Sequence, residues 1–161
     1  MRTIRLLFFA ILLSLNAAAT GAQTPTPAGL ELAADGKTIT LSLEDLAKLP
    51  QVEQEITFKT SKGMSTARYK GPLLWDVLKA SKALDGYERN KELAKTLLVT
   101  ASDGYQIAFS VGELAPEFGN AMILMALETN GVTHPQGLRI VAQGDKRGAR
   151  AIHDIAKIEL R

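Results

Sequence analysis

The residues of this chain best suited to binding a ligand gather near its C-terminus. Residues 144–150 read Gly-Asp-Lys-Arg-Gly-Ala-Arg, so that two glycines and three cations, Lys146, Arg147 and Arg150, share one short loop. Glycines let backbone N–H groups turn toward a common point, and cations around them suit a phosphate or a carboxylate. A solvated surface loop has the same composition, since basic residues are common on surfaces. Both interpretations stay open from the sequence.

A fourth cation, Arg139, lies inside the apolar stretch Leu138-Arg139-Ile140-Val141. In a strand, alternation places its side chain on the face opposite Leu138 and Ile140. If that face is buried, the guanidinium needs an acidic partner or an anionic ligand. If the face is open, Arg139 is only a cation at a sheet edge.

Two histidines and a tyrosine are further candidates. His134 and His153 could join a carboxylate in a metal site, but such sites usually need three or four converging ligands. We therefore favour solvent-facing or hydrogen-bonded histidines and predict no metal site. Tyr105 follows the Asp103-Gly104 turn and could line a pocket through its hydroxyl. The alternating pattern favours a core position for it instead.

Basic residues also crowd one predicted hairpin. A solvated face is the default interpretation of such a cluster, and an anion-facing rim is the sharper alternative. The residues concerned are Lys59, Lys62, Arg68 and Lys70.

The sequence lacks the residues and motifs on which several common catalytic and binding functions depend. The chain has no cysteine, so it has no disulfide, no thiolate nucleophile and no thiolate metal ligand. It also lacks the serine-hydrolase elbow, the serine–lysine pair, the zinc-protease helix, the nucleotide-binding glycine loops and the EF-hand. Ordinary hydrolase, nucleotide-binding and calcium-binding functions are thus disfavoured.

The N-terminus has the pattern of a secretory signal. Arg2 and Arg5 precede an apolar stretch from Leu6 to Leu15, and small residues follow up to Ala22. The apolar stretch is shorter than the roughly 20 residues that span a bilayer. We therefore predict a signal peptide over residues 1–22, cleaved near Ala22, and a chain that is periplasmic or secreted and has no later transmembrane segment.

The remainder is predicted to hold a Pro/Thr linker over residues 23–29 and one domain over residues 30–161. Two of the 19 basic residues and none of the 17 acidic ones lie in the signal peptide, so the rest of the chain is electrically balanced. A balanced domain with few aromatic residues is not expected to bind nucleic acid.

Turn signals and hydrophobic periodicity divide the domain into strands and short helices. Asp35-Gly36 predicts a hairpin, and Ser42 with Asp45 forms a capping-box pattern for a helix that ends before Pro50. Gly71-Pro72 opens a second helix, with Trp75 expected in the core. A mixed α/β domain with more strand than helix follows. The predicted strands are 30–33, 38–41, 52–60, 65–70, 97–101, 105–111, 122–127, 138–142 and 157–160.

These pieces, in this order, resemble a known family. The chain is similar to the molybdopterin-binding domain of sulfite-oxidase-type oxidoreductases over nearly all of residues 30–161, and the resemblance implies the mixed α+β fold of that domain. The stretches that carry it are the Asp35-Gly36 hairpin, Leu43–Leu46, Tyr69–Leu78, Ala101–Tyr105, Asn130-Gly131 and Gly137–Val141.

The resemblance also implies where a cofactor would bind. The family holds its pterin phosphate with basic residues near the C-terminal strands. His134 and Arg139 match the spacing of a family His and Arg, and Gly148–Ile152 matches a second family stretch, after which His153 replaces a Lys. The family's molybdenum is held by a cysteine before the Tyr-Lys-Gly helix, where this chain has Phe58-Lys59-Thr60-Ser61.

The leading hypothesis is therefore an exported domain of this fold that binds rather than catalyses. Its ligand would be an anionic small molecule or a pterin-like cofactor such as molybdopterin. A periplasmic or membrane-bound redox or sensor protein is an alternative partner for the same surface. The other hypotheses are a molybdopterin-dependent oxidoreductase with a non-Cys metal site and a passive protein-interaction module, in which Arg139 would pair with a buried acid. The candidate ligand-binding residues are His134, Arg139, Lys146, Arg147, Arg150, His153 and Tyr105.

Overall fold

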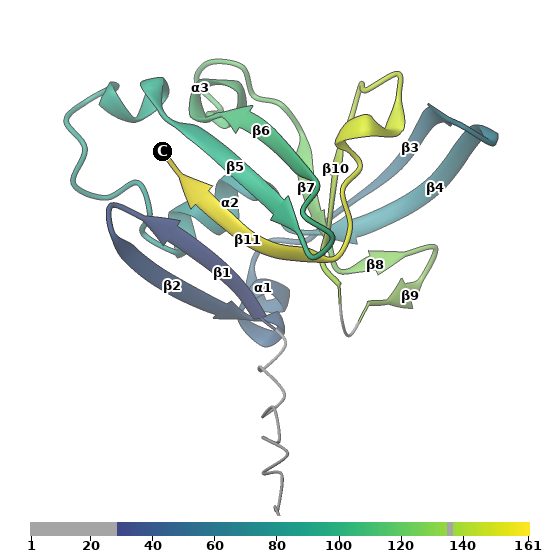
Figure 1. Ribbon diagram of the computed structural model, residues 1–161, viewed down its shortest axis with the longest axis horizontal. Helices are drawn as coiled ribbons and strands as arrows, with labels where there is room; N and C mark the ends of the chain where they lie inside the picture. Colours follow the sequence, from purple (N-terminus) through teal and green to yellow (C-terminus); the bar gives the residue numbers. More distant parts are fainter. Residues whose placement is uncertain (1–28, 135–136) are drawn as a thin grey trace, which may run out of the picture.

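The computed structural model describes residues 29–134 and 137–161 (Figure 1). The predicted signal peptide and residues 23–28 of the predicted linker lie outside the described residues, and Gly29 is the first residue of β1. The strands are β1 (Gly29–Ala34), β2 (Lys37–Ser42), β3 (Val52–Thr60), β4 (Gly63–Gly71), β5 (Thr96–Ala101), β6 (Gln106–Ser110), β7 (Ile123–Ala126), β8 (Glu128–Thr129), β9 (Val132–Thr133), β10 (Arg139–Ala142) and β11 (Ile155–Leu160). The helices are α1 (Leu43–Lys48), α2 (Leu74–Ala80) and α3 (Val111–Leu114), with 3₁₀ turns η1 (Lys91–Ala94) and η2 (Gly148–Arg150).

The largest sheet has five strands in the order β2-β1-β11-β5-β6. Its first two strands form the predicted hairpin. Asp35 and Gly36 have φ values of 47° and 75°, the left-handed conformation that a two-residue turn of this kind requires. β11 comes from the far end of the chain and pairs with β1 in parallel, with Leu32 opposite Ile158. The C-terminal strand therefore lies in the middle of the sheet, between the N-terminal hairpin and β5.

The first helix is held by the predicted capping box. The Asp45 N–H donates to Ser42 Oγ at 3.1 Å, and the Ser42 N–H donates to Asp45 Oδ2 at 3.1 Å. The Ser42 hydroxyl also donates to Asp45 Oδ2 at 2.6 Å, and this bond, followed by the one from the Ser42 N–H, holds the pKa of Asp45 below its usual value. The cap begins the helix at Leu43, which brings Leu46 into the core with no exposed surface. The helix ends at Lys48, before Pro50, as predicted.

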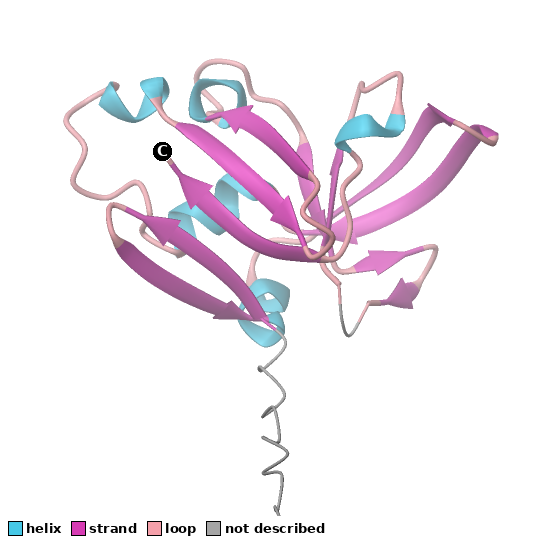
Figure 2. Cartoon of the chain, viewed as in Figure 1, coloured by secondary structure: helices cyan, strands magenta, loops and turns pink. Residues whose placement is uncertain are grey.

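A second sheet, in the order β3-β4-β8-β9, carries a long hairpin that extends from the body (Figures 1 and 2). β3 covers the predicted residues 52–60, and Val52 to Thr60 pair with Gly71 to Gly63 without a bulge. Alternation buries Ile56 and Phe58 on the inner face, with Tyr69 of β4 beside them. The outer face carries charged side chains. The inner face of this hairpin is thus available to line a site.

The apolar residues form two clusters separated by β7. Ile123 and Met125 face the main core under the five-stranded sheet, whereas Leu124 and Ala126 face a smaller cluster with Phe58. β7 pairs with β10 on one side and is hydrogen-bonded to the end of β4 on the other. Because both faces and both edges are covered, the predicted continuous apolar run over residues 122–127 is explained.

Two predictions about aromatic and apolar positions need correction. Tyr105 was predicted to pack in the core, but its side chain is 49% exposed because β6 begins one residue later, at Gln106. Trp75 is only half-buried at the edge of the main core.

In the described part of the chain, no helix is both long enough and apolar enough to cross a membrane.

Candidate functional site

A cleft of about 680 Å³ opens between the β3–β4 hairpin and the loop that precedes β11. We call it the basic cleft. One wall comes from the inner face and tip of the hairpin, and the other comes from β10 and η2. Its lining residues are Phe58, Lys59, Thr60, Ser61, Ser65, Tyr69, Arg139, Arg147, Gly148, Ala149 and Ala151.

The charges in the basic cleft all have one sign. Lys59, Arg139 and Arg147 line it, and none of its lining residues among 29–134 and 137–161 is acidic. Arg139 is half-buried, between the buried and the open alternative, and within those ranges none of the three cations forms an ion pair. Three unpaired cations around one hollow create a positive potential that attracts an anion.

The floor of the cleft is aromatic. Phe58 and Tyr69 are 7% and 3% exposed, so both rings are fixed by packing against the smaller core cluster. The Tyr69 hydroxyl makes no hydrogen bond to the part of the chain that the structure describes, and it is not among the solvent-shielded polar atoms that lack a partner there. It is therefore open to a ligand in the cleft.

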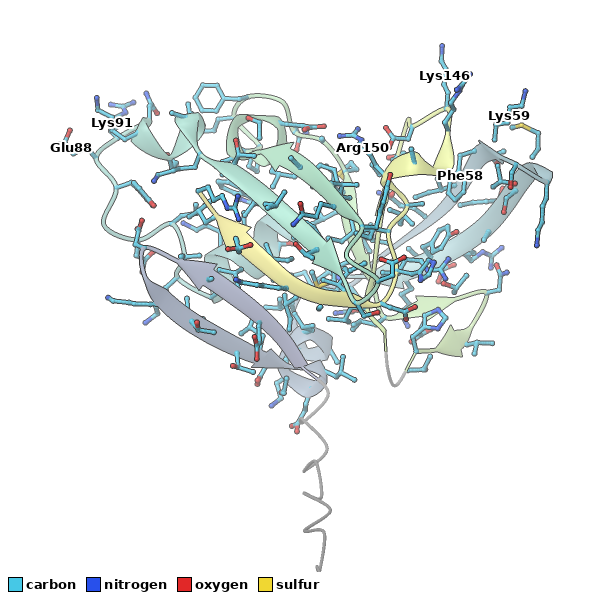
Figure 3. All side chains as sticks on the ribbon, viewed as in Figure 1. Phe58, Lys59, Glu88, Lys91, Lys146 and Arg150 are labelled. Atoms are coloured by element: carbon cyan, nitrogen blue, oxygen red, sulfur yellow. The ribbon has the colours of Figure 1, made fainter. Side chains whose placement is uncertain are left out.

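The loop wall lies directly against the hairpin. The Lys59 N–H donates to the Lys146 carbonyl at 3.0 Å, and Lys59 and Arg147 form an isolated parallel bridge. A Cβ atom placed on Gly148 would come within 2.8 Å of the Phe58 ring, so glycine is required for this close approach. Figure 3 shows Phe58 between the hairpin and the loop, with the Lys146 side chain extending away from the body.

Arg150 does not line the basic cleft. Its Nε and Nη2 donate to Asp145 at 3.0 and 2.7 Å, its Nη1 donates to Glu113 at 3.0 Å, and it lies 5.0 Å from the centroid of the Phe109 ring. The hydrogen bonds that Arg150 donates to Asp145 and Glu113 raise its pKa against the effect of burial. The Tyr105 hydroxyl donates to the Ala149 carbonyl at 2.9 Å on the same loop. Both residues therefore anchor the loop to β6 and α3.

Arg150→Ala is expected to lower the free energy of unfolding by about 1–2 kcal/mol, since Asp145 and Glu113 lose a charged donor and partial exposure limits the effect. Chemical denaturation would measure it. The matched control is Arg161→Ala, which removes an exposed arginine whose ion pair is with Glu159 and should change stability by less than about 0.5 kcal/mol. Equal effects of the two variants would show that Arg150 is not an anchor.

The two histidines lie apart and are hydrogen-bonded. His134 Nε2 is 2.8 Å from Thr129 Oγ1 beside β8, and His153 Nδ1 is 2.7 Å from Asp154 Oδ2 on the surface. Over residues 29–134 and 137–161, no group of three metal-binding side chains occurs.

The seven candidate residues from the sequence fall into three groups. Arg139 and Arg147 line the basic cleft, and Tyr105 and Arg150 anchor its loop. The other three, Lys146, His134 and His153, do not line the cleft.

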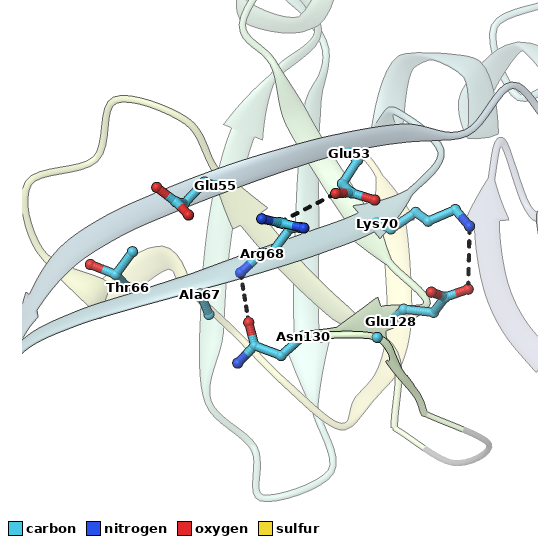
Figure 4. Close-up of a pocket in the computed structure, with 9 residues that line it drawn as sticks. Glu53, Glu55, Thr66, Ala67, Arg68, Lys70, Glu128 and Asn130 are labelled. Atoms are coloured by element: carbon cyan, nitrogen blue, oxygen red, sulfur yellow. Dashed lines mark hydrogen bonds and ion pairs between the residues drawn. The ribbon is translucent and has the colours of Figure 1, made fainter.

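Of the four hairpin cations, only Lys59 lines the basic cleft, near the tip of the hairpin. On the outer face, Arg68 pairs with Glu53 at 3.3 Å and Lys70 pairs with Glu128 at 3.6 Å, around a separate hollow of about 400 Å³ (Figure 4). Sequence reasoning missed Phe58 and Tyr69 as cleft residues, although their alternation onto one face was a usable signal.

The sequence resemblance implies molybdopterin as a cofactor, and the donor set of the basic cleft fits it only in part. The cations suit its phosphate, and the apolar floor formed by Phe58 and Tyr69 suits its organic ring system. The resemblance also implies a cysteine ligand for molybdenum, whereas the described lining offers hydroxyls, an ammonium group and guanidinium groups but no thiolate. The cleft residues therefore match the organic part of the cofactor and not its metal.

No protein-family model matches this chain, and no curated protein matches it. Among solved structures, the sulfane dehydrogenase SoxCD from Paracoccus pantotrophus is similar, with a TM-score of 0.61 and 15% sequence identity. The match covers 82% of this chain and 37% of that one, so the chain spans little more than a third of the length of the protein that it resembles. An identity this low shows the fold alone. This chain has the strand-rich mixed α+β fold of the sulfite-oxidase family, as its sequence predicted.

Proposed function

We propose that this chain is an exported domain that binds a small anionic ligand in the basic cleft. The ligand carries a phosphate or carboxylate on a flat ring, and a pterin-like cofactor is the leading candidate. The observation that carries the proposal is that Lys59, Arg139 and Arg147 all line one hollow whose described lining contains no acid. Export rests on the secretory pattern of residues 1–22.

The size and lining of the cleft support a small molecule. Its volume of about 680 Å³ lies in the usual range of ligand sites, and such sites pair aromatic walls with a few polar groups. Lys59 and Arg147 lie at the rim, Arg139 lies deeper, and Tyr69 supplies a hydroxyl on the floor. An anion held by the cations would place its ring against Phe58 and Tyr69.

Binding is favoured over catalysis by the chemistry of the same residues. The described lining holds no carboxylate, imidazole or thiol. General acid–base and nucleophilic catalysis most often use such groups. The cleft therefore offers charge attraction and an apolar floor. A redox or sensor protein that presents an acidic or phosphorylated segment is the alternative partner for these cations.

The test is a calorimetric titration of the purified chain with phenyl phosphate, inorganic phosphate and benzyl alcohol. We expect phenyl phosphate to bind at least about tenfold more tightly than benzyl alcohol, with inorganic phosphate between them and with affinity that falls as salt is raised. Native mass spectrometry of the same sample would detect a co-purified ligand. Equal binding of the phosphate and the alcohol would refute an anion site.

A further inference from the structure

One edge of the five-stranded sheet is formed by β2, which has a neighbouring strand on only one side among the described residues. Figure 1 shows β2 at the margin of the molecule, away from the β3–β4 hairpin. Ala34 and Lys37 flank a two-residue turn, so they form a hydrogen-bonded pair between β1 and β2. Alternation along an antiparallel pair then turns the backbone groups of Thr38 and Thr40 away from β1.

Four backbone groups on this edge therefore lack a partner. Within residues 29–134 and 137–161, the N–H and C=O groups of Thr38 and Thr40 form no hydrogen bond to any segment outside the hairpin. The next N–H that points outward, that of Ser42, already donates to Asp45 Oδ2. A strand that pairs with β2 would thus find its free donors and acceptors at Thr38 and Thr40.

The apolar side chains of β2 are incompletely covered as well. Ile39 and Leu41 pack on the main core but remain half-exposed. Leu32 and Leu30, directly opposite them on β1, have no exposed surface. At the other edge of the sheet, the inward-facing residues of β6 are buried. Burial of the remaining apolar surface therefore favours a further strand beside β2 rather than beside β6.

β2 also lacks the features that protect free edges in other proteins. Edge strands are commonly protected by internal charges, by proline or by a bulge. From Thr38 to Ser42 there is no charged residue and no proline, and the strand pairs with β1 in continuous register. Its one charged residue is Lys37, at its first position. The middle of the strand is thus open to pairing.

We propose that β2 pairs with β2 of a second copy of this chain, antiparallel and centred on Ile39, so that one sheet continues across both copies. A two-fold axis at Ile39 places Thr38 of each copy opposite Thr40 of the other. Each of these two pairs exchanges two hydrogen bonds, which satisfies all four free backbone groups. A register centred on Thr40 would instead place Thr38 opposite Ser42, whose N–H is already used.

The side chains fit the same register. The two Ile39 side chains meet at the axis and cover each other's exposed surface, and the threonines pair on the outer face, where Thr–Thr pairs are favourable. Lys37 lies opposite Leu41 of the second copy, two residues before α1, whose first turn is acidic. Each end of the interface therefore brings a cation toward an acidic helix start, and no like charges face each other.

This pairing is independent of the anion site. β3, β10 and η2, which line the basic cleft, lie on the opposite side of the molecule from β2 in Figure 1, so the cleft stays open in both copies. One short strand pair makes a small interface. We therefore expect a reversible dimer with a dissociation constant on the order of 10–100 µM.

Sedimentation equilibrium of the purified chain, from about 5 µM to about 500 µM, tests whether the dimer forms. We expect the mean mass to rise with concentration from that of one chain toward that of two. A chain that stays monomeric throughout this range would overturn the proposal.

Two double variants at exposed positions test the register. Thr38→Lys with Thr40→Lys places like charges opposite each other in both pairs, so it should weaken dimerisation at least about tenfold. Thr38→Lys with Thr40→Glu places opposite charges there, and it should dimerise at least as tightly as the unaltered chain. Thermal unfolding shows whether each variant is folded.

A mixing experiment separates this register from a general effect of added charge. Combining the Lys–Lys variant with the corresponding Thr38→Glu, Thr40→Glu chain should restore association, because the two copies then carry complementary pairs. A dimer that the Lys–Lys substitution leaves unchanged uses another surface and would refute the proposal. Loss of the dimer in the folded Lys–Glu variant would also refute it, because that variant keeps every pair of this register favourable.

Discussion

Arg139→Gln and Arg147→Gln are each expected to weaken phenyl phosphate binding roughly 10- to 100-fold. A hydrogen bond to a charged group contributes about 1.5–3 kcal/mol, and every 1.4 kcal/mol changes an equilibrium constant tenfold. Both arginines line the basic cleft without an acidic partner in the described chain, so their charge is available to a ligand. Calorimetric titration measures the loss, and thermal unfolding shows whether each variant is folded.

The matched control is Lys146→Gln. It removes the same charge from the residue next to Arg147, but Lys146 does not line the basic cleft, and its backbone contact with Lys59 does not involve its side chain. We expect a loss of less than about threefold, from long-range attraction alone. If Lys146→Gln weakens binding as much as Arg147→Gln, the loop acts as a diffuse positive surface and the cleft is not the site.

The second large effect concerns stability. Gly71→Ala should lower the free energy of unfolding by about 2–3 kcal/mol or more, because a Cβ atom there would overlap the Met125 carbonyl oxygen of β7 and lie 2.9 Å from its carbonyl carbon. Backbone atoms on a central strand cannot move aside cheaply. The hydrogen bonds that join the two segments, from Met125 N–H to Pro72 and from Leu127 N–H to Lys70, would be strained. Thermal unfolding should show a melting temperature lower by roughly 6–12 °C.

Gly112→Ala provides the comparison for this substitution. A Cβ atom on Gly112, in α3, would meet its nearest neighbour, Ser110 Oγ, at 3.5 Å, which is ordinary van der Waals contact. Alanine also restricts the unfolded chain, so stability should be unchanged or slightly higher. A Gly71→Ala variant as stable as Gly112→Ala would mean that β4 and β7 are not in the close contact described here.

The close approach at Gly71 also connects the fold to the basic cleft. Tyr69, two residues earlier on β4, forms the cleft floor, and Leu124 of β7 packs in the same small cluster. β10 pairs with β7 and carries Arg139. One side of the cleft is thus supported by β7, which is hydrogen-bonded at both edges. The other side is formed by the loop that Arg150 and Tyr105 anchor. Any rearrangement on ligand binding is expected in the loop.

Local structure in this protein follows closely from local sequence. The Asp35-Gly36 turn, the Ser42–Asp45 capping box and the 52–60 strand were predicted with nearly correct boundaries. Each depends on residues a few positions apart, whose turn propensity, capping and alternation act without the rest of the chain. The Tyr105 prediction was wrong because alternation was extended one residue beyond the strand, into a turn in which the Tyr105 N–H binds Asp103 Oδ1 at 2.9 Å.

By itself, the sequence determined the mixed α+β fold and the kind of charge that gathers near the C-terminus. Only the tertiary structure decided which cations share a cleft. Arg150 forms an ion pair with Glu113, which lies 37 residues away in the sequence. Lys59 lies at the end of β3, and its backbone N–H donates to the Lys146 carbonyl of the loop. A separate aromatic hollow likewise joins Trp75, Tyr87 and Phe118 from separate segments. Composition and periodicity indicate which face of a strand or helix a side chain occupies. Which distant charges and rings come together depends on how the sheets pack, and that packing depends on contacts throughout the core.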